Sequence, residues 1–233
     1  MNSHADSKQI EALRLLSGCA IANAVESFGV RLRNEGFVDG SVRCLFPRLQ
    51  PMVGHAVTLK VRGANPPTGA RTYLDSTDWW DYILSVPEPR VVVVQDVSSK
   101  PGIGAFLGEV HSNILKALSC VGAVTNGSVR DLPAVERLGF HFFAGTLSVS
   151  HSYVHIVETG APVAIGGLTI SSGDLLHGDQ HGIQTIPISL VEQIPQAAAA
   201  IAAREKAVID QCRSSDVTLE KLRSVVGRTA SQR

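Results

Sequence analysis

The sequence has no excess of charge of either sign. Its 233 residues include 21 basic and 21 acidic side chains, and the lysines and arginines form no cluster. A domain that binds nucleic acid has a basic patch or stripe, so nucleic acid is not expected as a partner. The chain also has no apolar run of the roughly 18 residues that span a membrane, and no signal-peptide pattern at its N-terminus. These absences indicate a cytoplasmic protein without a membrane partner.

Cysteine is scarce and scattered. The four cysteines, Cys19, Cys44, Cys120 and Cys212, are far apart in the chain and form no Cys-x-x-Cys motif. Disulfide frameworks and zinc sites depend on characteristic cysteine spacings, so these four are expected to be reduced thiols.

Length and apolar content favour one domain. The chain is 44% apolar, which is enough for a sizeable core, and it contains no internal repeat or low-complexity linker. We expect a single domain over residues 1–233, with a helical segment at about 1–30, an α/β core at about 53–190 and a C-terminal helix at about 191–212.

The middle of the chain alternates between strand and helix patterns. VVVVQDV at 91–97 is the continuous β-branched run of a strand that is buried on both faces. A helix is predicted next, from the spacing of apolar residues in EVHSNILKALSC, and a second buried strand follows in VGAVTN. The pattern then predicts a short helix in LPAVERLGF and a third strand in HFFAGT. Short strands broken by glycine and proline follow residue 154. The prediction is an α/β fold with a β-hairpin-rich C-terminal part and flanking helices.

Three charged residues bracket one apolar stretch, GEVHSNILKALSCVGAVTNGSVRD at 108–131. Glu109 opens the first of these helices, while Arg130 and Asp131 directly follow the second strand. In a right-handed β-α-β unit, the C-terminal ends of the strands and the N-termini of the following helices lie on the same edge of the sheet, where ligands bind. We therefore expect the three residues to meet there.

Two carboxylates beside a guanidinium suit a particular chemistry. The carboxylates can hold a hard divalent cation such as Mg²⁺, and Arg130 can bind a substrate carboxylate through two hydrogen bonds. The amides at the start of the helix, around Gly108 to His111, offer a second anion site. The alternative is structural: an Arg/Glu salt bridge, with Asp131 serving only as the N-cap of the next helix.

The sequence has Gly108-Glu109 and, after twenty residues, Arg130-Asp131 at the end of NGSVRD. This combination resembles the pattern of the RraA-like superfamily, which includes metal-dependent 4-hydroxy-4-methyl-2-oxoglutarate aldolases. The later segment ISSGDLLHGDQHGIQTIP is similar to the family's PGD…GD…DG…VP segment, and the likeness covers roughly residues 53–190. The resemblance implies a single α/β/α swivelling-type domain that assembles as a homotrimer or homohexamer, with active sites near subunit interfaces.

The resemblance also implies roles for individual residues. In the aldolases the residue matching Arg130 binds the pyruvyl carboxylate, the one matching Asp131 coordinates Mg²⁺ or Mn²⁺, and the acid matching Glu109 contacts the metal through water. Backbone groups at Gly108, Val110 and His111 would help to bind the substrate. The implied activity is a lyase that cleaves a 2-keto acid through a pyruvate enolate, by retro-aldol cleavage, oxaloacetate decarboxylation or both.

The chain departs from the aldolases after the third strand. They have a loop containing Asp and Arg where this chain has SVSHSYVHIVETGAP, and the chain has no match for the acid that a neighbouring subunit can bring. His151 of this loop is a candidate substrate contact or acid/base, with His155 beside it. Some superfamily members instead bind a ribonuclease and inhibit it, so a non-enzymatic regulator is the alternative function.

Two further patterns point to other sites. GIGAFLG at 102–108 has glycines like those of a dinucleotide-binding loop, but four residues separate it from the preceding strand. His177, Asp179 and His181 have the chemistry of metal ligands, yet they fall at the glycine-punctuated tip of a hairpin, where a solvated turn is expected.

Overall fold

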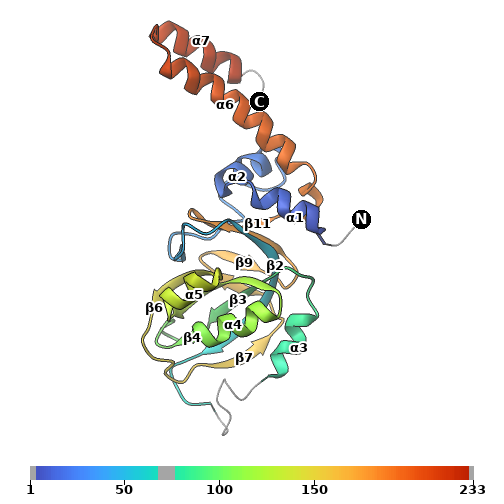
Figure 1. The fold of residues 1–233 in the computed structure, drawn as a ribbon, viewed down its shortest axis with the longest axis vertical. Coiled ribbons are helices and arrows are strands. Elements are labelled where there is room, and N and C mark those ends of the chain that lie inside the picture. The colour runs from blue at the N-terminus through green and yellow to red at the C-terminus, as the bar shows by residue number, and fades with distance from the viewer. Residues whose placement is uncertain (1–3, 68–76, 231–233) are drawn as a thin grey trace.

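The computed structural model describes residues 4–67 and 77–230. A nine-stranded mixed sheet forms its centre, with the strand order β1-β6-β5-β3-β2-β10-β11, β4 beside β5 and β7 beside β2 (Figure 1). The central strands β2, β3, β5 and β6 are parallel. The strands of this sheet are β1 (Arg43–Cys44), β2 (Met52–Arg62), β3 (Arg90–Asp96), β4 (Ala105–Leu107), β5 (Cys120–Val129), β6 (His141–Leu147), β7 (His155–Thr159), β10 (Leu175–Asp179) and β11 (Gly182–Ile186).

Strand β3 connects the sequence pattern to the layers of the fold. Because successive side chains of a strand point to opposite faces, Val92 and Val94 join one core cluster while Val91 and Val93 join another. All four side chains are at most 1% exposed. The predicted strand buried on both faces is therefore confirmed.

Helices cover one face of the sheet and a hairpin covers the other. The helices α3 (Asp78–Leu84), α4 (Glu109–Ala117) and α5 (Leu132–Leu138) pack on the face that contains Val92 (Figure 1). The hairpin of β8 (Val163–Ile165) and β9 (Leu168–Ile170) packs on the opposite face. These layers confirm the α/β class and the hairpin-rich C-terminal part.

The helical segment predicted at about 1–30 consists of two helices. They are α1 (Ser7–Arg14) and α2 (Gly18–Ser27). The break occurs because Ser17 begins a new helix, its Oγ accepting a hydrogen bond from the Ala20 N–H at 3.2 Å. Both helices pack with β10, β11 and α6 (Ile194–Arg213) in a third core cluster.

The C-terminal part is longer and more helical than the sequence pattern indicates. The predicted helix at 191–212 corresponds to α6, preceded by a 3₁₀ turn at Ile188–Leu190. The sequence analysis missed α7 (Leu219–Ala230), which pairs with α6 in a helical hairpin that projects from the body (Figure 1). No helix in the described part of the chain is long and apolar enough to cross a membrane.

Two strand-to-helix connections place the candidate residues. β4 leads through Gly108 into α4, and β5 leads through Arg130 and Asp131 into α5. Since β4 and β5 are parallel neighbours, both connections emerge at one edge of the sheet. A hydrogen bond of 3.0 Å from the Arg130 N–H to the Leu107 carbonyl joins the two strand-to-helix connections.

Candidate active site

Asp131 lies at the centre of the candidate site. Its Oδ2 accepts a hydrogen bond from the backbone N–H of Glu109 at 3.0 Å and lies 3.3 Å from Nε of Arg130. The backbone of Asp131 is left-handed, with φ 58° and ψ 34°, a conformation that costs a non-glycine residue free energy. The three residues that bracket the apolar stretch are therefore neighbours, at the edge that the topology predicted.

The side chain of Asp131 does not cap the helix that follows it. α5 begins at Leu132 without a side-chain cap hydrogen bond, whereas the Asp131 carboxylate binds the first amide of α4. The structural alternative predicted that the Asp131 side chain caps α5, and this is wrong, because the side chain binds α4 instead. The contact joins two separate loops, so local capping rules could not reveal it.

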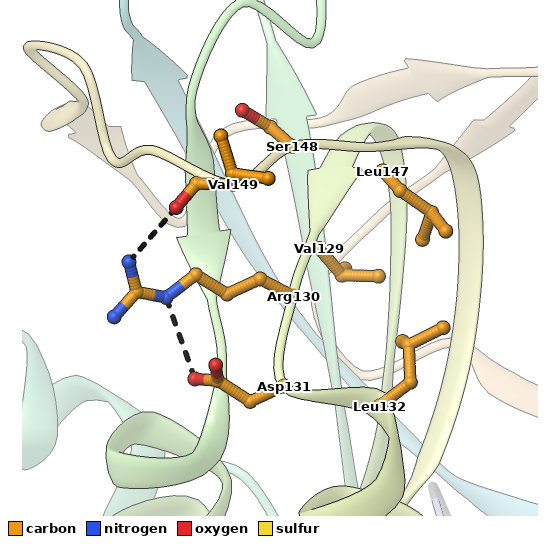
Figure 2. A pocket seen from close by; sticks show the side chains of 7 residues that line it. All are labelled: Val129, Arg130, Asp131, Leu132, Leu147, Ser148 and Val149. Carbon is orange, nitrogen blue, oxygen red and sulfur yellow. Dashed lines mark hydrogen bonds and ion pairs between the residues drawn. The ribbon is translucent and has the colours of Figure 1, made fainter.

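Arg130 extends toward the loop that follows β6 (Figure 2). Its Nη1 donates to the Val149 carbonyl at 3.4 Å, and its Nε is buried beside Asp131 without a well-aligned hydrogen bond. Nη2 has no hydrogen-bond partner among the described residues, and the side chain is 32% exposed. The guanidinium therefore has donors left for a ligand carboxylate.

A pocket of about 500 Å³ opens beside this pair. In Figure 2 the charged groups of Arg130 and Asp131 point to one side, and the aliphatic side chains of Val129, Leu132 and Leu147 point to the other. The volume lies within the usual range for small-molecule sites. The lining residues are Val129, Arg130, Asp131, Leu132, Leu147, Ser148 and Val149.

Glu109 and Gly108 contribute mainly backbone to this cluster. Glu109 is the first residue of α4, and its exposed carboxylate has no hydrogen bond or ion pair with the described residues. Gly108 has no side chain, and a Cβ at this position would lie 2.6 Å from Oδ2 of Asp131. Val110, the second residue of α4, is 63% exposed. The roles of these residues toward a substrate stay predictions.

His111 is buried beneath the start of α4. Its ring is stacked on Phe106 with centroids 4.8 Å apart and meets Trp79 edge-on at 6.2 Å. Burial is the main cause that lowers the pKa of His111 to about 4; a hydrogen bond with the Phe106 backbone opposes the shift, and the nearby His151 contributes to it. The imidazole is therefore neutral near pH 7 and is enclosed by aromatic rings, so a substrate contact would come from its backbone amide.

His151 lies in the loop after β6, outside the residues that line the pocket. Its Nδ1 donates to the Ala105 carbonyl at 2.7 Å. The loop also approaches Gly104 so closely that a Cβ at position 104 would lie 2.1 Å from the His151 carbonyl oxygen. His155 makes a similar local contact, 2.8 Å from the Tyr153 carbonyl. The loop is thus packed on β4, and a role of His151 in substrate binding stays a prediction.

Within the His177-Asp179-His181 cluster, His177 and Asp179 anchor the N-terminal helices. Asp179 is 7% exposed, and its Oδ2 accepts the Gly18 N–H of α2 at 2.7 Å. His177 is fully buried and hydrogen-bonds the Leu16 carbonyl at 3.1 Å. His181, at the tip itself, is 50% exposed, as expected of a solvated turn. The expectation of solvation is wrong for His177 and Asp179, because the N-terminal helices pack on this hairpin, a contact between segments more than 150 residues apart.

The glycines of GIGAFLG have a packing role. The short strand β4 separates Gly104 from Gly108, so the segment is not the strand-turn-helix of a dinucleotide-binding loop. Gly102 has φ 86°, and a Cβ there would meet Thr146 at 2.6 Å. These positions allow neighbouring loops to approach closely.

A family model described as RraA-like, aldolase/RraA, matches residues 18–184. The chain belongs to this family. A curated relative from Halalkalibacterium halodurans, named "Putative 4-hydroxy-4-methyl-2-oxoglutarate aldolase", is 32% identical over 123 residues, which are 51% of this chain and 59% of the relative. The match thus covers less than two thirds of that relative's length.

Two solved structures agree with the RraA-like fold. An uncharacterized protein from Pseudomonas syringae pv. tomato str. DC3000 has a TM-score of 0.72 with 22% identity, covering 95% of each chain. Streptomyces coelicolor RraAS2, described as an unusual member of the RNase ES inhibitor RraA protein family, has a TM-score of 0.67 with 22% identity, covering 87% of this chain and 96% of that one. The expected swivelling-type fold is confirmed.

The donor set near Asp131 fits a hard cation. Two carboxylates, those of Asp131 and Glu109, belong to residues in direct contact, and both offer oxygen. No cluster of three or more His, Cys, Asp or Glu side chains with metal-site geometry occurs within residues 4–67 and 77–230. Mg²⁺ usually keeps several waters and takes only one or two protein carboxylates, so this sparse set suits it. A structural zinc site would need four protein ligands.

Proposed function

We propose that this RraA-like protein is a divalent-metal-dependent carbon-carbon lyase that cleaves a 2-keto acid through a pyruvate enolate. The reaction is retro-aldol cleavage of the 4-hydroxy-4-methyl-2-oxoglutarate type, oxaloacetate decarboxylation, or both. The observation that carries the proposal is the contact between Asp131, Arg130 and the first turn of α4 at the edge of a pocket. The name of the Halalkalibacterium halodurans relative supports the same chemistry.

Arg130 and Asp131 divide the binding of substrate and cation. Arg130 holds the substrate carboxylate, because a guanidinium offers two parallel donors to the two oxygens. Asp131 and Glu109 would hold Mg²⁺ or Mn²⁺, with Asp131 as the direct ligand and Glu109 in an outer contact. Backbone groups at Gly108, Val110 and His111, together with His151, would complete the substrate contacts.

In the retro-aldol reaction the C3–C4 bond of the substrate breaks. Its electron pair passes to C3 and the keto group as the enolate, the C4 hydroxyl loses its proton, and a carbonyl forms at C4. A bound divalent cation supplies a Lewis acid that stabilises the developing enolate charge. The exposed carboxylate of Glu109 is suited to move the proton, since it is not engaged by another described residue. Protonation of the enolate at C3 then gives pyruvate.

The test is a screen of the purified protein with Mg²⁺ or Mn²⁺ against oxaloacetate and 4-hydroxy-2-keto acids, detecting pyruvate. We expect metal-dependent turnover that Asp131→Asn abolishes. The fold should survive this change, because the Asn oxygen can still accept the Glu109 N–H. Arg130→Lys should lower kcat/KM at least tenfold despite the retained charge, since lysine lacks the bidentate fork.

The alternative function predicts a different outcome from the same preparation. A regulator that binds a ribonuclease would show no metal-dependent turnover and would co-purify with a large partner. Tight Mn²⁺ binding by Asp131→Asn in calorimetry, equal to that of the parent, would remove the central residue of the lyase proposal.

A further inference from the structure

The Asp131 carboxylate is held by one oxygen only. Oδ2 accepts the Glu109 N–H at 3.0 Å and lies 3.3 Å from Arg130 Nε. Oδ1 has no hydrogen-bond or ion-pair partner among the described residues, and Figure 2 shows this second oxygen outside the contact with Arg130. The Asp131 side chain as a whole is 37% exposed.

Gly108 makes this arrangement sterically possible. A Cβ at position 108 would lie 2.6 Å from Asp131 Oδ2, 3.0 Å from Arg130 Cγ and 3.4 Å from Arg130 Nε. The backbone of Gly108 is extended, with φ −155° and ψ −160°, which any residue can adopt. The glycine is therefore required by the close approach of Asp131 and Arg130, and not by its own conformation.

The left-handed backbone of Asp131 is a second, independent sign that this position is constrained. An Asp with φ 58° is strained unless its surroundings hold it, and such strain gathers at functional sites. Here the usual compensation is missing, because the side chain makes no cap hydrogen bond to α5. The side chain turns instead to α4, on the side of Gly108.

We infer that Gly108 and the amide of Glu109 are positioning groups for the Asp131 carboxylate. They fix it through Oδ2 and leave Oδ1 to the cation. The inference rests on the proposed metal-dependent function and adds to it two groups that act through Asp131 and not on the substrate. Hydrogen-bonded supports of this kind hold a metal-ligating carboxylate in one orientation and typically contribute a factor of about 10–100 to metal affinity.

The same chain contains a purely structural version of this contact. Asp179 accepts the Gly18 N–H of α2 at 2.7 Å, and a Cβ on Gly18 would lie 2.9 Å from Asp179 Oδ1. In that case both oxygens are engaged, because Oδ1 also accepts the His181 N–H at 2.8 Å. Asp179 therefore has no oxygen to spare for a cation, which makes Gly18 a matched control for Gly108.

Proline at position 109 tests the amide directly. Glu109 is the first residue of α4, where proline is tolerated, and the extended Gly108 suits a residue before proline. Glu109→Pro and Glu109→Ala both remove the carboxylate, but only the proline variant removes the N–H that Asp131 accepts. We expect Mn²⁺ binding, measured by calorimetry, to be about tenfold weaker in Glu109→Pro than in Glu109→Ala. Equal affinities would overturn the inference.

Gly108→Ala and Gly18→Ala form the second comparison. Gly108→Ala should weaken Mn²⁺ binding about tenfold, whereas Gly18→Ala should lower the Tm and leave the Mn²⁺ affinity of the folded protein unchanged. If Gly108→Ala also changes only the Tm, the positioning role is refuted while the lyase proposal stands. If Asp131→Asn binds Mn²⁺ like the parent, it is the lyase proposal that fails.

Discussion

Among individual residues, His111 connects the site to the stability of the protein. It is 5% exposed and lies against Phe106 and Trp79, and burial lowers its pKa to about 4. An unfolded histidine titrates near 6.5. The folded state therefore favours the neutral ring, so the stabilisation is complete above pH 6.5 and is lost as the pH falls from 6.5 toward 4.

We predict that acid destabilises the protein in this window and that His111→Phe reduces the effect. The contribution of His111 to the free energy of unfolding should fall by about 3 kcal/mol between pH 6.5 and pH 4, at 1.36 kcal/mol for each pH unit of pKa difference. Phenylalanine keeps the aromatic contacts and cannot be protonated. Urea unfolding at several pH values measures the slope, and His155→Phe, at a partly exposed position, is the control. If the free energy of unfolding of His111→Phe depends on pH as steeply as that of the parent, protonation of His111 does not destabilise the folded state.

At the scale of elements, Arg90 joins the ends of two helices at the edge opposite the site. It is 7% exposed, and its guanidinium donates to the carbonyls of Val86 at 2.6 Å and Leu118 at 2.9 Å. The Leu118 carbonyl ends α4, and Val86 follows the end of α3. A cation is favoured here because the C-terminal ends of helices carry partial negative charge. Arg90 thus fixes both helices on the sheet.

Arg90→Met should lower the free energy of unfolding by about 3 kcal/mol, because the buried Val86 carbonyl and the partly buried Leu118 carbonyl both lose the guanidinium donor. The midpoint of guanidinium chloride unfolding measures the loss. Arg33→Met is the matched control, since the Arg33 side chain is 78% exposed and its ion pair with Glu26 is 3.7 Å long. Arg33→Met should change the free energy of unfolding by no more than about 0.5 kcal/mol. Equal effects in the two variants would contradict the structural role of Arg90.

The elements also show which features can be predicted from sequence. Strand β3 and helices α4 and α5 follow from local periodicity, and the meeting of Glu109 with Asp131 follows from the β-α-β topology. The partner of the Asp131 side chain could not be predicted, because a cap that reaches another helix depends on how two loops approach. Burial of Asp179 was missed for the same reason. The break at Ser17 could have been predicted, because serine is a favoured N-cap and its Oγ binds the amide of Ala20, three residues later.

At the scale of the whole molecule, apolar side chains remain exposed around the candidate site. Val149 is 96% exposed and Leu147 is 55% exposed, and both line the pocket. Val110, next to Glu109, is 63% exposed. Apolar groups that gather at one place on a surface commonly mark an interface. A second copy of the chain that covers this edge would also reduce the access of water to the Arg130-Asp131 pair.

We therefore predict a homo-oligomer of at least three chains in which this edge is covered. Light scattering at micromolar concentration should give at least three times the 24.8 kDa of the chain. Val149→Asp should shift the mass toward the monomer, because a buried carboxylate without a partner is costly. Leu84→Asp is the control, since Leu84 is 53% exposed at the end of α3, on the edge near Arg90. A parent protein of monomer mass would contradict the assembly, and Val149→Asp with unchanged mass would place the interface on another face.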